Sequence, residues 1–376
     1  MSRIATVVVG AGHLGRIHTR LACSLESLDV IGVIDPDPAA RERVGKEFGT
    51  PTFASIDELS RMPEAAIVAA PTALHHQLGR RFLAEGIHVL MEKPITVDSR
   101  QAAELIDLAQ RSDAVLQVGH VERFNPAFRR LSERIERAKF VQTRRLSEYT
   151  FRSTDVGVVL DLMIHDLDLV LSLIEAPVTK VDAVGISIMG DHEDIAQARL
   201  EFEDGSVATL EASRCSFTRE RSVTAFSDRA FARADLTAGA VRSIAPDPDL
   251  LARAVPFLSL DASGKDQVKS ELFSRWLPLV DEQVTPSNAI LDEQADFARA
   301  IRGDRRPTVD GRQGMRALQV AERILDEIRE HAWHGRSIPV RGPLAGPLPR
   351  VVGQAEPSAE KLSVETPEEA SRRRAG

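Results

Sequence analysis

The sequence is poor in cysteine and in long apolar runs. Its two cysteines, Cys23 and Cys215, lie far apart and outside any Cys-x-x-Cys spacing. Such a pair indicates reduced thiols and neither a disulfide framework nor a zinc site. No stretch approaches the roughly 18 apolar residues that a membrane-spanning helix needs. The short apolar start of the chain also lacks the form of a signal peptide. We therefore expect a cytoplasmic protein with no membrane partner.

Positive charge is not in excess either. Lys and Arg total 48 against 56 Asp and Glu, which gives a net charge of -8 at pH 7. Counterion release and anionic lipid both favour a basic surface, so this balance argues against nucleic-acid and membrane-surface binding. The length of 376 residues exceeds what one hydrophobic core usually supports. We expect two domains.

The first motif is a glycine-rich turn between a strand and a helix. Residues 4–9 are a β-branched run, followed by Gly10-Ala11-Gly12-His13-Leu14-Gly15 and then a helical pattern. In the dinucleotide fingerprint the first glycine permits the turn, the second lets the backbone approach a pyrophosphate, and the third lets helix and strand pack closely. The alternative is a purely structural glycine turn. The residues expected to bind the cofactor here are Gly10, Gly12, His13, Leu14 and Gly15.

The second expected strand, over 30–34, ends in Asp35, about 20 residues after the last glycine of the turn. An acid at this place suits the ribose hydroxyls of a dinucleotide and repels a 2′-phosphate. No arginine follows directly, because Pro36-Asp37-Pro38 comes next. NAD is therefore favoured over NADP. The alternative is that Asp35 only caps the following helix.

Strands and helices then alternate up to about residue 120, which predicts an α/β fold with a doubly wound parallel sheet. Helices are expected over 41–48, 56–62, 78–85 and 98–110, with strands near 51–53, 65–70, 89–92 and 115–118. Several polar residues follow the carboxyl ends of strands and should meet in one crevice: Pro71, Thr72, His75, Glu92, Lys93 and His120. Of these we expect Pro71, Thr72, His75 and Glu92 to contact the cofactor.

Lys93 stands out because an apolar strand, Val89-Leu90-Met91, runs straight into Glu92-Lys93-Pro94. Burying an ammonium without a partner costs several kcal/mol. A lysine at the carboxyl end of a parallel strand therefore suggests a catalytic role. The alternative is that Lys93 merely pairs with Glu92 at a strand end. We also predict a cis peptide bond before Pro94.

The second half of the chain reads differently. Alternating segments near 140–149, 181–189, 195–202, 207–215 and 223–227 predict a mostly antiparallel sheet with one face on a helix and one open face. Such a face predicts a homo-oligomer, dimer or tetramer. Residues 228–285 read as edge strands and a loop, and helices follow over 288–301 and 313–330. We expect domains over 1–120 and 121–340, and a disordered tail over 341–376.

A second polar pair lies on an apolar helix expected over 158–174. Asp161 and His165 are four residues apart, so they share a face, and the carboxylate can orient the ring for proton transfer. The first alternative is a helix-surface contact without a catalytic role. The second is a metal site of His165, Asp166 and Asp168, which we disfavour because no further His or Cys cluster has ligand spacing.

These motifs together resemble the Gfo/Idh/MocA oxidoreductases. The resemblance rests on Gly10-x-Gly12-x-x-Gly15, Pro71-Thr72-x-x-His75, Glu92-Lys93-Pro94 and Asp161-x-x-x-His165, and it spans residues 1 to about 335. It implies a Rossmann domain, a C-terminal α+β domain and a nicotinamide bound between them. It also implies hydride transfer at a sugar or cyclitol carbon. Lys93 would contact the substrate, Asp161 and His165 would be the acid/base pair, and Asp35 the ribose ligand.

A finer resemblance lies in Gly119-His120-Val121-Glu122-Arg123-Phe124-Asn125-Pro126. It is similar to the nucleotide-sugar branch of the family, especially UDP-N-acetylglucosamine 3-dehydrogenases that supply amino-sugar precursors of lipid A. Arg123 and Asn125 could hold a sugar or diphosphate oxygen. Alternatively, Asn125 caps a helix that begins at Pro126. The expected substrate contacts are Lys93, His120, Glu122, Arg123, Asn125, Asp161 and His165.

The sequence thus predicts an NAD-dependent dehydrogenase that oxidises a secondary sugar hydroxyl. Two alternatives stay open. One is a free-sugar or inositol dehydrogenase with the same machinery. The other is a non-catalytic NAD-binding regulator on the same fold, which would be expected to have lost Lys93, Asp161 and His165, all of which are present.

Overall fold

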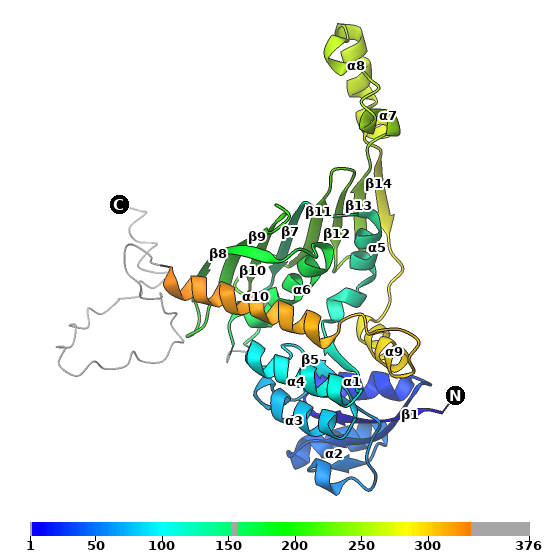
Figure 1. The fold of residues 1–376 in the computed structure, drawn as a ribbon, viewed down its shortest axis with the longest axis vertical. Coiled ribbons are helices and arrows are strands. Elements are labelled where there is room, and N and C mark those ends of the chain that lie inside the picture. Colours follow the sequence, from blue (N-terminus) through cyan, green and yellow to red (C-terminus); the bar gives the residue numbers. More distant parts are fainter. Residues whose placement is uncertain (1, 152–155, 332–376) are drawn as a thin grey trace, which may run out of the picture.

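The computed structural model describes residues 2–151 and 156–331, which form two sheets with their own helices (Figure 1). The N-terminal sheet is entirely parallel, and the C-terminal sheet is mixed. The predicted tail over 341–376 and the end of the predicted second domain lie outside the described residues.

The N-terminal sheet has six strands in the order β3-β2-β1-β4-β5-β6, the doubly wound arrangement that the sequence predicted. Its strands are β1 (Ile4–Val9), β2 (Leu28–Ile34), β3 (Thr52–Phe53), β4 (Ala65–Val68), β5 (His88–Glu92) and β6 (Leu116–Gly119). Its helices are α1 (His13–Ser24), α2 (Pro38–Phe48), α3 (Thr72–Ala84) and α4 (Ser99–Arg111). The helix expected over 56–62 is wrong: only a 3-10 turn, η1 (Ile56–Glu58), forms there. Pro63 disfavours the helical conformation of the residue before it.

The C-terminal sheet has eight strands in the order β14-β13-β12-β11-β7-β10-β9-β8. Only the β7–β10 pair is parallel, so the expectation of a mostly antiparallel sheet is confirmed. The strands are β7 (Phe140–Leu146), β8 (Val178–Ile186), β9 (Ile195–Phe202), β10 (Val207–Ser213), β11 (Glu220–Phe226), β12 (Phe231–Asp235), β13 (Ala240–Ile244) and β14 (Leu279–Gln283).

One face of this sheet packs on helices. Apolar residues of α5 (Pro126–Arg134), the π-helical turn η3 (Val159–Met163), α6 (Ile164–Leu173) and α10 (Gly311–Glu330) join sheet residues in one buried core. The opposite face carries polar and charged side chains, among them Arg144, Glu211 and Arg233, around an open hollow of about 490 Å³. The predicted combination of one helix-covered and one open face is therefore confirmed.

Residues 245–278, hereafter the arm, leave the sheet between β13 and β14 and stand away from the rest of the molecule (Figure 1). The arm contains α7 (Pro248–Leu251), η4 (Phe257–Ser259), α8 (Ala262–Ser270) and η5 (Leu272–Trp276). Trp276 is its one buried residue in the described ranges. The edge strands expected over 228–285 are confirmed, but the expected loop is instead a helical excursion.

The last helices connect the two sheets. Helix α9 (Ala289–Ile301) returns to the N-terminal domain, where Phe297 joins the core formed by Val8 and Ala22. Helix α10 places Leu318 in the core of the N-terminal sheet and Ala321 in that of the C-terminal sheet. No helix in the described ranges combines the length and the apolar character needed to cross a bilayer.

Candidate active site

The glycine-rich turn between β1 and α1 has the shape that a dinucleotide requires. Gly10 has a φ of 101°, and a Cβ there would lie 2.5 Å from the carbonyl oxygen of Ala69. A Cβ on Gly15 would meet the carbonyl of Gly10, so helix and turn pack too closely for any other residue. At Gly12 a Cβ would meet nothing within 4 Å, so the start of α1 faces open space. The first turn of α1 carries no acidic residue, which leaves its amides suited to phosphate.

Asp35 lies against this turn. Its Oδ2 accepts a 2.6 Å hydrogen bond from the amide of Ala11, and its Oδ1 accepts one of 2.8 Å from Asp37. The helix cap is Asp37, whose Oδ1 accepts from Ala39, so the alternative of Asp35 as cap of α2 is wrong. The carboxylate remains beside the turn, where the fingerprint places the ribose.

The ends of β4 and β5 are held together by His75. Its Nδ1 lies 2.8 Å from the carbonyl oxygen of Pro94 and its Nε2 2.9 Å from that of Ala70. The ring is buried, and burial lowers its pKa against the opposing effect of these carbonyls. Both nitrogens thus face backbone, and a contact of His75 with the cofactor stays a prediction, as it does for Pro71 and Thr72, where α3 begins. The peptide bond between Lys93 and Pro94 is cis, as predicted.

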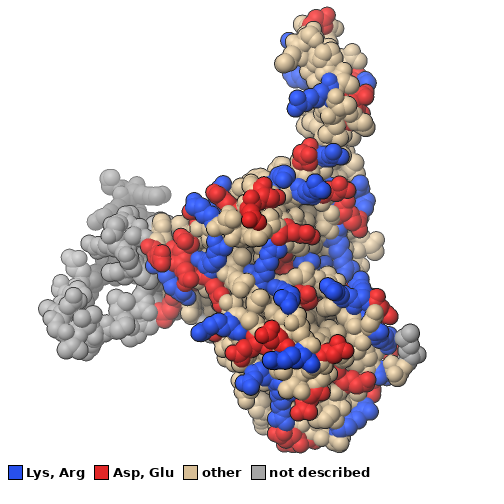
Figure 2. Space-filling model, viewed as in Figure 1, with Lys and Arg blue, Asp and Glu red and all other residues tan. Residues whose placement is uncertain are grey.

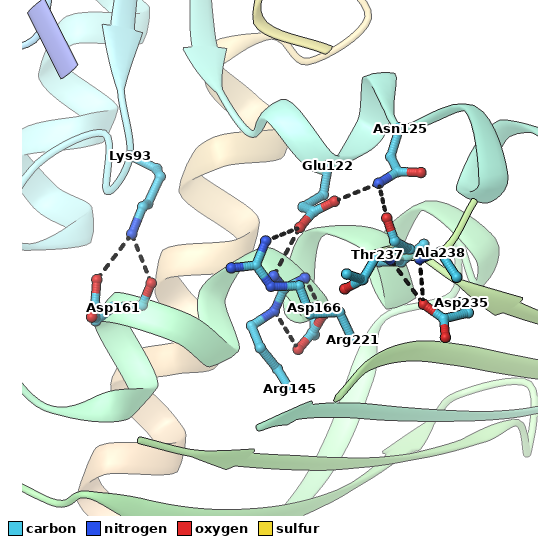
Figure 3. A network of polar contacts seen from close by, with 11 residues as sticks. Lys93, Glu122, Asn125, Arg145, Asp161, Asp166, Arg221, Asp235, Thr237 and Ala238 are labelled. Atoms are coloured by element: carbon cyan, nitrogen blue, oxygen red, sulfur yellow. Dashed lines mark hydrogen bonds and ion pairs between the residues drawn. The ribbon is translucent and has the colours of Figure 1, made fainter. Parts of the chain in front are cut away.

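Lys93 reaches from the end of β5 to the π-helical turn η3 (Figure 3). Its Nζ donates a 2.7 Å hydrogen bond to the backbone carbonyl of Asp161 and lies 3.5 Å from the Asp161 carboxylate oxygen Oδ1. Burial lowers the pKa of Lys93, and the charges of Asp161 and Glu92 oppose that shift. The alternative pairing of Lys93 with Glu92 alone is therefore wrong, because its ammonium bonds across the domain boundary.

His165 follows in the first turn of α6. Burial lowers its pKa well below the ordinary value, and the positive charge of Lys93 adds to the effect, so the ring is neutral at pH 7. Its Nδ1 is buried without a hydrogen-bond partner among the described residues. The predicted orientation of His165 by Asp161 is not seen: the Asp161 carboxylate lies beside the Lys93 cation, a stronger partner than a neutral imidazole.

His120 lies beside His165, with ring centroids 6.4 Å apart and the planes perpendicular. Its ring is buried, and neither nitrogen finds a partner among the described residues. Burial lowers the pKa of His120, an effect that Asp168 opposes and Lys93 reinforces. Two neutral imidazoles with free nitrogens thus lie beside the lysine.

The hub of this site is Arg145 on β7, a residue that we did not predict as part of the site. Its guanidinium donates to both oxygens of Asp166, at 3.0 and 2.8 Å, and to Glu122 at 2.8 Å (Figure 3). It thereby ties the residue after His165 to the short helix η2 (Val121–Phe124). The signal was the strand period: Arg145 lies on the buried phase of β7, while its neighbour Arg144 faces solvent.

The remaining predicted substrate residues are engaged within the chain. Arg123 donates to Asp168 at 3.3 Å. Asn125 caps α5 by accepting from Ala127, and its amide nitrogen donates to Glu122 and to the carbonyl of Leu236. The capping role is confirmed. Contacts of Glu122, Arg123 and Asn125 with a substrate stay predictions.

Asp166 and Asp168 each pair with an arginine, Arg145 and Arg123 respectively. This pairing removes the basis for the alternative metal site with His165. Three further residues near Lys93 that the sequence did not single out are His18, Glu293 and Gln294, all fully buried. His18 lies on α1, and Glu293 and Gln294 lie on α9, so these residues come together only when the chain folds.

Two family models match the chain. One, described as "Oxidoreductase family, NAD-binding Rossmann fold", covers residues 4–120, and the other, described as "GFO/IDH/MocA C-terminal domain", covers residues 127–233. Their boundary coincides with the passage from β6 to α5. The first domain is thus an NAD(P)-binding Rossmann domain.

Among similar proteins is the UDP-N-acetylglucosamine 3-dehydrogenase of Acidithiobacillus ferrooxidans, 36% identical over 215 residues that cover 57% of this chain and 68% of that protein. A solved structure of that enzyme matches with a TM-score of 0.75 at 30% identity, over 87% of this chain and 98% of that one. The scyllo-inositol 2-dehydrogenase of Bacillus subtilis is 26% identical over 233 residues, 57% of this chain and 68% of that protein.

A further solved structure shows likeness of fold alone. The WlbA dehydrogenase from Bordetella pertussis, described in complex with NADH and UDP-GlcNAcA, matches with a TM-score of 0.71 at 17% identity. The match covers 87% of this chain and 96% of that one.

Proposed function

The chain belongs to the Gfo/Idh/MocA family of NAD-dependent sugar dehydrogenases, and from this premise we propose that it oxidises C3 of UDP-N-acetylglucosamine or of a related nucleotide sugar, with NAD as acceptor. The observation that carries the chemistry is the meeting of Lys93, Asp161 and neutral His165 at the carboxyl end of β5. Open parallel sheets bind their ligands at this end.

In the proposed reaction His165 accepts the proton of the substrate hydroxyl. A neutral imidazole within reach of a hydroxyl is a competent general base, and burial keeps His165 in this form. Lys93 hydrogen-bonds the oxygen on which negative charge develops. Asp161 holds the lysine through its backbone carbonyl and its carboxylate, which keeps the ammonium aimed at one place. A bound nicotinamide would supply the acceptor for the hydride of the same carbon.

Support for a nucleotide sugar comes from two directions. The relative from A. ferrooxidans carries that activity in its name at 36% identity. The stretch 119–126, which includes Arg123 and Asn125, also resembles the nucleotide-sugar branch of the family. If the substrate assignment holds, the product would be an amino-sugar precursor of the kind used for lipid A.

NAD is proposed over NADP because of Asp35. Its carboxylate lies beside the glycine turn and would repel a 2′-phosphate. The guanidinium of Arg41, on the following helix α2, is committed to the backbone carbonyls of Asp35 and Pro36, at 2.6 and 2.9 Å.

The test is turnover, followed by the absorbance of reduced nicotinamide, against UDP-N-acetylglucosamine, free hexoses and inositols. We expect activity on the nucleotide sugar with NAD and much less with NADP. Activity confined to a free polyol would overturn the substrate proposal and favour the inositol dehydrogenase alternative. The B. subtilis relative, a scyllo-inositol 2-dehydrogenase by name, is the reason to test it. Dinucleotide binding without turnover on any sugar would favour the regulator.

A further inference from the structure

Behind Lys93 a row of buried polar side chains crosses from α9 to α1 and on to β5. Gln294 on α9 donates from Nε2 to Nδ1 of His18 at 2.9 Å, and His18 Nε2 lies 2.7 Å from Glu92 Oε1. Glu92 Oε2 in turn accepts from the backbone amide of Lys93 at 3.1 Å. Gln294 and His18 are both fully buried, so solvent does not compete for these bonds.

The geometry fixes the proton on His18. Gln294 Nε2 also lies 3.1 Å from the backbone carbonyl oxygen of His18, and a carbonyl oxygen only accepts hydrogen bonds. The atom of Gln294 that faces it is therefore the amide nitrogen, which donates to Nδ1 as well. Nδ1 then carries no proton, so a neutral ring carries its proton on Nε2 and donates it to Glu92.

We propose that Gln294 is a positioning residue of the active site: by setting the tautomer of His18 it orients Glu92, and through Glu92 the strand end that carries Lys93. The inference rests on the proposed function, because it assigns Lys93 its place in the reaction. It gives α9, far along the chain, a part in aligning the lysine.

The charge on Glu92 agrees with this arrangement. Burial works to raise the pKa of Glu92, but the hydrogen bond from His18 and the positive charge of Lys93 act against it, and the pKa of Glu92 lies below its ordinary value. The neighbouring carboxyl of Glu293 behaves in the opposite way. Burial, with the charges of Glu92 and Asp168, raises the pKa of Glu293 well above its usual value.

A metal ion is the competing interpretation, since one ligand atom each of His18, Glu92 and Glu293 lie within 4.8 Å of one another. The hydrogen bonds argue against it. Nε2 of His18 donates to Glu92, and Nδ1 accepts from Gln294, so neither nitrogen has a lone pair left for an ion. The raised pKa of Glu293 also favours its neutral form, which is a weaker ligand than a carboxylate.

The first test compares turnover of Gln294→Leu with that of Phe297→Leu, a substitution in the core packing of the same helix. Gln294→Leu should lower kcat by about ten- to a hundredfold, as a misplaced catalytic group does, while KM for NAD stays near the wild-type value. Phe297→Leu should lower the Tm without that loss of kcat. Equal losses of kcat in the two variants would overturn the proposal.

The second test asks whether the donor to Glu92 is what matters. His18→Gln places an amide nitrogen near the position of Nε2 and should keep more of the wild-type kcat than His18→Leu. Equal kcat in the two His18 variants would contradict the proposed chain of hydrogen bonds.

The third test does not depend on turnover. The ¹⁵N spectrum of histidine-labelled protein should show His18, assigned by its loss in His18→Leu, with a protonated Nε2 and a bare Nδ1. A proton on Nδ1 would overturn the inference, as would a stoichiometric metal in the purified protein that Glu293→Gln removes. If wild-type protein turned over no sugar, the proposed function would fail, and this spectrum would still decide the proton on His18.

Discussion

At the scale of single residues, the proposed reaction depends most on Lys93. Its side chain is only 14% exposed, and Asp161 supplies both a carbonyl and a carboxylate to hold the ammonium. Lys93→Met keeps the length of the side chain and removes the charge. We expect turnover to be abolished and NAD binding to be retained, measured by steady-state kinetics and by quenching of protein fluorescence. A Lys93→Met protein with near-normal kcat would rule out the proposed role.

The pH dependence of turnover follows from two lowered pKa values. His165 must be neutral to accept a proton, and its pKa lies well below 6.5. The decrease of kcat/KM on the acid side of the profile should therefore occur at a pH below 6.5. Lys93 must be charged to stabilise an alkoxide, and its pKa lies below 10.5. The decrease of kcat/KM on the basic side should therefore occur at a pH below 10.5. His165→Asn should remove the acid limb together with most of the activity. An acid limb above pH 6.5 would contradict the assignment of His165.

Arg145 and Arg144 form a matched pair for stability, since both bind two carboxylates and only their burial differs. Their side chains are 4% and 48% exposed. Arg145→Met leaves Asp166 and Glu122 buried without their partner, which should lower the free energy of unfolding by about 3–5 kcal/mol. Arg144→Met should cost about 0–1 kcal/mol, as exposed pairs do. Denaturant titrations of the two variants measure the difference. Equal losses of unfolding free energy would show that Arg145 does not stabilise the fold more than Arg144 does.

At the scale of elements, the arm is the part of the described chain with the least support from the rest. Leu258 is 99% exposed and Phe273 56%, while Trp276 is buried against the arm's own Phe257, whose ring centroid lies 5.5 Å away. In the view of Figure 2 the arm projects from the body and carries charges of both signs, as the body does. An element of this kind contributes little to the stability of the fold.

The arm can therefore be removed cleanly. Ile244 and Leu279 are paired across β13 and β14, so residues 245–278 can be replaced by an Asn-Gly turn. We expect the shortened protein to keep its Tm within a few degrees and to bind NAD normally, measured by differential scanning fluorimetry with and without the dinucleotide. Loss of folding would show that the arm stabilises the sheet.

At the scale of the whole molecule, the open face of the C-terminal sheet remains the proposed site of self-association. Its hollow is lined by side chains of both signs, so a second copy can meet it with opposite charges. We expect light scattering to give a multiple of the 41.2 kDa chain mass. Thr209→Lys, in the hollow, should shift the mass to that of one chain, whereas Ser60→Lys, exposed on the N-terminal domain, should not. A monomeric wild-type protein would overturn the proposal.

What the sequence determined was local. Gly10 and Gly15 lie where a Cβ would collide with the backbone, so no other residue fits. The glycine motif can therefore be recognised from the sequence. The run that ends at Lys93 and the spacing of Asp161 and His165 could be recognised for another reason. Buried strands and helices impose fixed periods on their residues. The doubly wound order, the open second sheet and the cis bond at Pro94 could all be predicted in this way.

What the tertiary structure decided was partnership. Asp161 pairs with Lys93 and not with His165, because the fold brings a cation to η3 that the helix spacing alone does not reveal. Arg145 meets Glu122 and Asp166 across two further elements, and Gln294 reaches His18 across 276 positions. Hydrogen bonds and charges act over a few ångströms whatever the separation along the chain. Which groups face one another therefore depends on how the helices cross the sheets, and a single sequence does not record that.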